Sequence, residues 1–210
     1  MFNDTDHLVF ETEMPLAVLP MPKSERFYTL AEYLVREENS RELHEYFNGS
    51  IIKLPMARGP HNIITINVSA ELRFLAKANQ ERFLVMGGQQ LVYLPQLNFG
   101  LYPDALAVTD SPQYFDRNEV LLTNPILIVE VLSKGTKKYD RNEKFDEYRT
   151  LDSFQEYVLI DQKRCSIEIR YREKPDTWQY TTITDINGSI FLKSIGCSIT
   201  VADIYANVKI

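Results

Sequence analysis

The sequence lacks several features that would assign it to a class of protein at once. Only Cys165 and Cys197 occur among 210 residues, which is too few for a disulfide framework, and they are not spaced as thiolate ligands of a metal. No apolar run approaches the roughly 20 residues that a helix needs to cross a bilayer. The acidic, polar start does not resemble a secretory signal. We therefore expect a cytoplasmic protein with no membrane partner.

An excess of positive charge is missing as well. The formal net charge is −6, from 23 Lys and Arg against 29 Asp and Glu. Nucleic-acid-binding proteins are typically basic, so the total gives no support to a DNA partner, although cationic residues gathered in one cleft would still allow one. No internal repeat is visible. The length and the 44% hydrophobic content are sufficient for one continuous core.

What the sequence does contain is a proline-rich arm followed by one domain. Residues 1–24 show no periodicity and predict an extended arm, and residues 25–210 predict a single domain. Thr29 with Glu32 is a capping box, and Asn48-Gly49 is a strong hairpin turn. The pattern predicts helices over 30–38, 61–79 and 137–150, a hairpin over 43–54, a polar loop over 109–124, and strands over 82–86, 89–94 (joined to 82–86 at Gly87-Gly88), 102–108, 125–133, 155–161, 166–172, 178–182 and 190–192.

This order of elements predicts a mixed α/β (α+β) fold in which helices flank a central mixed sheet. The stretch 125–133 is rich in branched apolar residues and predicts a strand buried on both faces. With 137–150 and 155–161 it forms a βαβ unit, which predicts two neighbouring parallel strands. Alternation places Ile126, Ile128, Glu130 and Leu132 on one face of the strand. A carboxylate on such a face is costly unless an opposite charge or a metal binds it.

Three residues are the candidates for catalysis. Glu130 is the first, and its structural alternative is a buried salt bridge. Asp104 follows Pro103 in an apolar stretch, where it could equally be a turn residue. Two such acids on adjacent strands would form an oxygen-rich pocket suited to Mg²⁺. Lys144 is spaced four residues from Asp140 and from Tyr148; it could hold a water and stabilise developing charge, or form a surface ion pair with Asp140.

Further polar residues could support this group. His61 follows Gly59-Pro60 at a helix start, where it suits a phosphate or metal-water contact or simple packing. Tyr148 suits an orienting or core role. Glu45 lies just before the hairpin turn. A basic cluster formed by Lys137, Lys138, Arg141 and Arg149 is either a solvated face or a contact to a nucleic-acid backbone.

Six short motifs in order resemble the Uma-two family of restriction endonucleases, in the PD-(D/E)xK superfamily. The likeness extends from about Thr29 to Asp161. Its motifs are Glu45-Tyr-Phe-Asn-Gly-Ser-Ile51, Gly59-Pro-His61, Tyr102-Pro-Asp-Ala-Leu-Ala-Val108, Val129-Glu-Val-Leu-Ser133 with Thr136, Asp140 with Lys144 and Tyr148, and Glu156-Tyr-Val-Leu-Ile-Asp161.

The resemblance implies a restriction endonuclease-like core and a metal-dependent nuclease. It implies that Asp104 and Glu130 bind Mg²⁺ or Mn²⁺, that Glu45 is a further metal ligand, that DNA is the substrate, and that the protein is a homodimer. The superfamily's lysine would stand at Leu132, and the pattern points instead to Lys144. A main-chain carbonyl at 131 or 132 can still bind the cation. The Pro-Ser that usually follows Leu-Ser is Lys134-Gly135 here.

Two other functional classes stay open at this point. The fold could serve as a nucleic-acid or protein binding module whose acids no longer catalyse a reaction, which the acidic charge and the missing Glu-x-Lys favour. It could also be a metal-dependent hydrolase of small phosphoesters.

Overall fold

The computed structural model describes residues 26–210. The expected arm over 1–24 lies outside these residues. In chain order the elements are α1 (Leu30–Glu38), β1 (His44–Phe47), β2 (Ser50–Lys53), α2 (Gly59–Ala78), β3 (Phe83–Gly87), β4 (Leu91–Leu94), β5 (Phe99–Leu101), β6 (Ala105–Thr109), β7 (Leu121–Leu122), β8 (Pro125–Leu132), α3 (Lys137–Arg141), α4 (Glu143–Tyr148), β9 (Glu156–Asp161), β10 (Ile167–Lys174), β11 (Thr177–Ile183), β12 (Ser189–Leu192), β13 (Cys197–Thr200) and α5 (Val201–Ile204).

The central layer is a six-stranded mixed sheet with strand order β11-β10-β9-β8-β6-β3. β8 and β9 run parallel, as the βαβ unit predicts, and the other neighbours are antiparallel. Every residue of β8 is buried. The predicted mixed fold with a central sheet flanked by helices is therefore confirmed.

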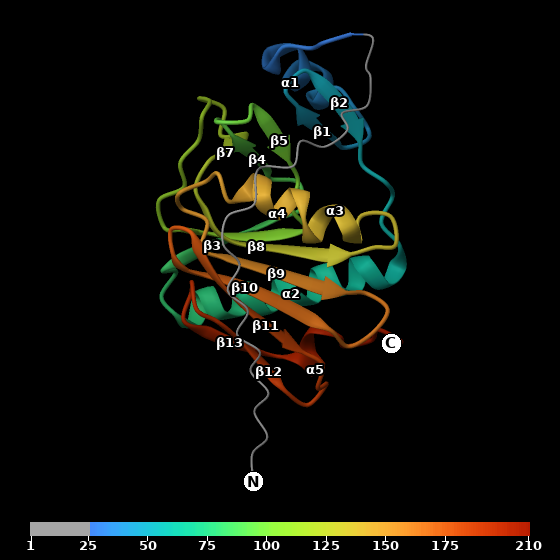
Figure 1. Cartoon of the computed structure of the whole chain (residues 1–210), viewed down its shortest axis with the longest axis vertical. Helices are drawn as coiled ribbons and strands as arrows, with labels where there is room; N and C mark the ends of the chain where they lie inside the picture. Colours follow the sequence, from blue (N-terminus) through green and yellow to red (C-terminus); the bar gives the residue numbers. More distant parts are fainter. Residues whose placement is uncertain (1–25) are drawn as a thin grey trace.

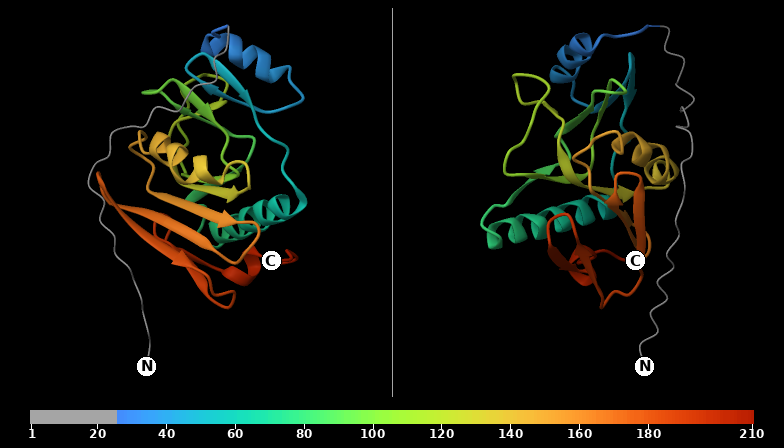
Figure 2. Two further views of the ribbon diagram at one scale, coloured as in Figure 1. Left: turned by 45° about the vertical axis from the view of Figure 1, so that its right-hand side comes forward. Right: turned by 60° about the vertical axis from the view of Figure 1, so that its left-hand side comes forward.

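The two faces of this sheet are covered by different helices (Figures 1 and 2). On one face α2 buries an apolar stripe, which packs against residues such as Leu127 and Val129. On the other face lie α3 and α4, which pack through Phe145 and Tyr148. The helices between β8 and β9 thus place one side-chain layer directly above the Glu130 face of β8.

A second, five-stranded sheet lies above α3 and α4 in Figure 1, with strand order β2-β1-β5-β4-β7. Its hairpin turns at Asn48 and Gly49, whose φ angles of 42° and 104° fit the tight turn that the Asn-Gly pair predicts. The short β12-β13 pair and α5 complete the core below α2.

The structure corrects several details of the sequence prediction. The strands around Gly87-Gly88 belong to two different sheets, β3 to one and β4 to the other. The loop over 109–124 contains β7, and β5, β13 and α5 have no counterpart among the predicted elements. Ile126 packs with the α2 face rather than with Ile128, because a register irregularity displaces the start of β8 against β6.

The remaining corrections concern the two segments that carry Asp104 and Lys144. The helix predicted over 137–150 is two short helices, because Asn142 leaves helical geometry with φ −118° and ψ −85°. The strand predicted over 102–108 begins only at Ala105, so Asp104 lies in the bend before β6. Both changes affect where the polar residues of the site are held.

Candidate active site

Glu130 is held in the middle of the molecule by β8. Its neighbours on the same face, Ile128 and Leu132, belong to the core beneath α4. The residue is only 4% exposed. A carboxylate in this position has been removed from water by the strand itself and requires a cationic partner.

Lys144 supplies that partner. Its Nζ atom lies 2.9 Å from Glu130 Oε1 and 3.2 Å from Glu45 Oε1. It also donates to the Tyr102 carbonyl at 3.3 Å. An ammonium group has three donors, and here each one faces an acceptor. The surface ion pair with Asp140 considered as an alternative is wrong, because both Lys144 and Asp140 are buried and Lys144 pairs with other acids.

Glu45 and Tyr148 complete what we call the Lys144 cluster, defined as Glu45, Glu130, Lys144 and Tyr148. Glu45 comes from β1, in the five-stranded sheet, and accepts a hydrogen bond from the Tyr102 amide at 3.2 Å. The Tyr148 hydroxyl donates to Glu130 Oε1 at 3.3 Å. The cluster therefore joins β8 and α4 to β1, which lies far from them in the sequence.

Asp104 lies next to this cluster, at the end of β6 that faces Glu130. Ala105 pairs with Val129, so continuing the antiparallel register places Asp104 beside Glu130. Asp104 Oδ2 accepts a hydrogen bond from the Val131 amide at 2.7 Å. Gly88 backs this bend so closely that a Cβ atom there would lie 3.2 Å from the Asp104 carbonyl oxygen. The bend is thus fixed from two sides.

His61 is paired with Asp104 rather than with the Lys144 cluster. Its Nε2 atom lies 3.3 Å from Asp104 Oδ2. Burial alone would lower the pKa of His61, but the hydrogen bond to Asp104 and the charge of that carboxylate outweigh it and raise the pKa. The six residues proposed from the sequence therefore form two adjoining groups, the Lys144 cluster and the His61–Asp104 pair.

The electrostatics of the Lys144 cluster follow from burial. Removal from water opposes the charged form of Lys144, but Glu130 and Glu45 outweigh this effect and raise the pKa of the ammonium. Burial likewise raises the pKa of Glu130, although Lys144 opposes the change. The site holds more carboxyl groups than cationic groups, and this favours binding of an additional cation.

Two further buried acids lie near the site: Asp140, which the sequence suggested only as a motif residue or a surface partner of Lys144, and Glu147, which the sequence analysis did not name. Burial raises the pKa of Asp140 to about 6 and that of Glu147 to about 7. Tyr139 donates to Glu147 Oε2 at 2.7 Å. Both acids lie in the segment that carries Lys144, so a burial estimate for the whole segment, rather than for one helical face, could have found them.

A divalent cation at this site would need several hard oxygen ligands. Among residues 26–210 no group of three or more His, Cys, Asp or Glu side chains is arranged to hold a metal ion. Mg²⁺ in phosphate-processing sites commonly uses one or two carboxylates together with water and substrate oxygens. Asp104 and Glu130 supply such a pair of hard oxygen ligands and fit this kind of cation. Glu45 carries a further carboxylate beside Lys144.

Together, a mixed sheet flanked by helices and a buried acid–lysine cluster at its centre place the protein with nuclease-like folds. A solved structure from Anabaena variabilis, described as a putative nuclease belonging to DUF820, has a similar fold, with a TM-score of 0.69 at 17% sequence identity over 85% of this chain and 98% of that chain.

Sequence comparison then gives the family. The Uma2 family, described as "Putative restriction endonuclease", matches residues 30–202, and the chain belongs to it. Two proteins from Synechocystis are similar to this chain, and both are described as uncharacterized. One, sll1609, is 32% identical over 79% of this chain and 92% of its own length. The other, slr1290, is 30% identical over 83% of this chain and 89% of its own length.

Proposed function

We propose that this protein is an endonuclease that depends on Mg²⁺ or Mn²⁺ and hydrolyses phosphodiester bonds in DNA. The observation that carries the proposal is the buried contact between Lys144 and Glu130, with Asp104 beside them at the end of β6. The family membership supports a nuclease activity. In the structure no helix of residues 26–210 is long and apolar enough to cross a membrane.

Each residue then has a role that its position supports. Asp104 and Glu130 would hold the cation, with Glu45 as a supporting ligand. When bound, the cation lowers the pKa of a water and neutralises phosphate charge. Lys144 orients the attacking water and stabilises the negative charge that develops on the phosphate. Because its three donors are occupied, the water must replace one acceptor, and the Tyr102 carbonyl is the most distant of them.

His61 and Tyr148 position the two acids. The Tyr148 hydroxyl fixes the orientation of Glu130 through its hydrogen bond. His61 fixes Asp104, and its raised pKa favours a cationic ring that can also approach a phosphate oxygen. One such site cuts one strand at a time, so we expect a homodimer that cuts both strands of a duplex together, which light scattering in solution would detect.

The test is cleavage of supercoiled plasmid with EDTA, Mg²⁺ or Mn²⁺. We expect nicking only with a divalent cation and a loss of about 10²–10³-fold in Asp104→Asn and in Glu130→Gln, since each substitution removes a charge that acts on the transition state. Glu81→Gln is the matched control, because Glu81 pairs with Arg73 on the surface. Cleavage that persists in both site variants would refute the proposal, and DNA binding without cleavage under either cation would indicate a binding module instead.

A further inference from the structure

A hollow of about 440 Å³ opens at the carboxyl ends of β8 and β9. The two strands are parallel, and Leu132 pairs with Asp161 at their ends, so the turns that follow them lie side by side. Figure 1 shows both arrowheads at the same edge of the sheet. The residues that line the hollow, which we call the basic hollow, are Leu132, Ser133, Lys134, Lys137, Asp161, Lys163 and Arg164.

The charge of the basic hollow is opposite in sign to that of the protein. Four of its lining residues are cationic and one is acidic, whereas the whole chain has a net charge of −6. Arg164 pairs with the one acid, Asp161, at 3.3 Å. Lys134, Lys137 and Lys163 are exposed, and within the described part of the chain none of them forms an ion pair. Three ammonium groups are thus available to an anion.

The turn after β9 is held rigidly although its cations are exposed. The Lys163 amide donates to Asp161 Oδ1 at 2.9 Å. The Tyr205 hydroxyl lies 3.0 Å from the carbonyl oxygens of both Asp161 and Arg164, on the inner side of the turn. Because these contacts fix the backbone, Lys163 and Arg164 start from a defined position, and little backbone entropy is lost when an anion binds.

The turn after β8 is fixed in the same way. Ser133 Oγ accepts the Thr136 amide at 3.2 Å, and the Ser133 carbonyl accepts the Lys137 amide at 3.0 Å. The buried Gln162 side chain donates to the Leu132 carbonyl at 3.0 Å and ties the two turns together. The basic hollow is therefore a preformed feature in which two stabilised turns present their lysines to the same space.

The basic hollow lies at a definite distance from the proposed catalytic acids. Ser133 is three residues beyond Glu130, directly after the end of β8, which corresponds to about 10 Å at ~3.3 Å per residue. Phosphates of one strand of B-DNA are spaced by about 3.4 Å along the helix axis. A phosphate in the basic hollow would therefore be about three nucleotides from one that lies at Glu130.

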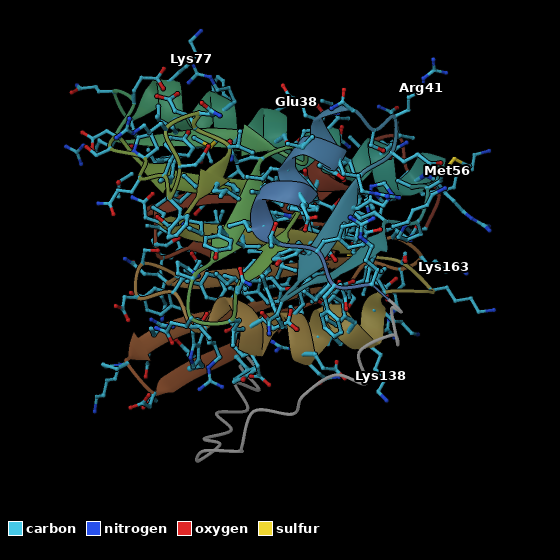
Figure 3. All side chains as sticks on the ribbon, turned by 90° about the horizontal axis from the view of Figure 1, so that it is seen from above. Glu38, Arg41, Met56, Lys77, Lys138 and Lys163 are labelled. Carbon is cyan, nitrogen blue, oxygen red and sulfur yellow. The ribbon has the colours of Figure 1, made fainter. Side chains whose placement is uncertain are left out.

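We propose that the basic hollow binds backbone phosphates of the DNA substrate a few nucleotides away from the bond that is cut. This inference rests on the proposed function for its substrate. It explains how a protein with an acidic total charge approaches a polyanion, because the cations that meet DNA are concentrated next to the site. In Figure 3 Lys163 extends into solvent on one side of the molecule, and Lys77 does so on the other.

The test compares two double variants that remove the same charge. Lys134→Gln with Lys163→Gln changes one lysine from each turn. Lys77→Gln with Lys174→Gln is the control, because both lysines are exposed and lie at the ends of α2 and β10, away from the hollow. Binding of a short fluorescent DNA duplex is measured by anisotropy without divalent cations, over a range of salt concentrations.

We expect the first double variant to bind about tenfold more weakly, with a salt dependence whose slope is smaller by about 2, and the control to resemble the wild type. Equal weakening in both variants, weakening in neither, or no binding by the wild-type protein would overturn the inference. Failure of the proposed function looks different: the wild-type protein would show this binding pattern and yet cleave no DNA with either cation. Conversely, cleavage whose kcat/KM is unchanged in the first double variant would refute the basic hollow alone.

Discussion

The two faces of the six-stranded sheet differ in the side chains that the same strand, β8, presents to them. On the α2 face, Leu127 and Val129 pack against the aliphatic stripe of a long helix. On the α4 face, the same strand places Glu130 among aromatic rings and an ammonium group. Burial of apolar surface stabilises the first face, whereas ionic groups on the second face are removed from water at a cost.

This difference indicates that the two faces of one β-strand have different roles. Apolar contacts on the α2 face stabilise the fold, and this offsets the cost of holding charged groups in a fixed arrangement on the α4 face. Such an arrangement is typical of sites at which charge develops during a reaction. Substitutions on the two faces should therefore have different consequences for stability and for activity.

The largest effect on folding is expected from Lys144→Met. It leaves Glu130 and Glu45 buried without their cation, and we expect a loss of about 4 kcal/mol in the free energy of unfolding, measured with urea. Adding Glu130→Gln should restore about half of this loss, because one uncompensated charge disappears. Leu72→Ala on the α2 face should cost about 3 kcal/mol, with no rescue by Glu130→Gln. Equal stability of Lys144→Met and wild type would show that the cluster is not held by this ion pair.

The next largest effect is the pH dependence of stability that arises from Glu147. Burial raises its pKa from 4.5 to about 7 in the folded protein, although the Tyr139 hydrogen bond opposes the shift. The folded state therefore binds this proton more tightly, and the associated stability is complete below pH 4.5 and is lost as the pH rises through about 7.

Glu147→Gln removes this titration and keeps an oxygen that can accept from Tyr139. As the pH is raised from acidic to mildly alkaline values, we expect the free energy of unfolding of the variant to increase by up to about 3 kcal/mol relative to that of the wild type. Urea unfolding at both ends of that range measures the difference. Glu81→Gln is the exposed control, and a difference for Glu147→Gln that did not change with pH would show that this carboxyl does not titrate as described.

The smallest effect is expected from Tyr148→Phe. It removes one hydrogen bond to Glu130 at 3.3 Å and should lower stability by about 1 kcal/mol. Cleavage should fall much less than in Glu130→Gln, since the acid itself remains. An equal loss in the two variants would instead show that the hydroxyl contacts the substrate.

Much of the fold could be predicted from the sequence because local signals agree with it. The capping box at Thr29 and Glu32 is present as expected, and the first helix has the predicted bounds. The alternation in β8 correctly separates Glu130 from Val129 and Val131. Short apolar strands such as β7 carry no such signal, since their two residues pair only through tertiary contacts.

The site was only partly predictable, because some of its contacts depend on tertiary structure and leave no local signal in the sequence. Spacing placed Lys144 on one face with Tyr148, and the structure brings both to Glu130. Spacing gave no reason to expect the separate pairing of His61 with Asp104, because it depends on how α2 crosses the sheet. Nor did it reveal the basic hollow, which is formed by two turns that meet only because β8 and β9 are neighbours.

Lys144 joins the two sheets of the protein. Its acceptors come from β1 and β8 and from the segment before β6, so the cluster exists only after contacts between distant parts of the sequence have formed. Contacts of this kind form late and slowly during folding. A partly synthesised chain therefore has no assembled Lys144 cluster, and the centre is complete only after both sheets have formed.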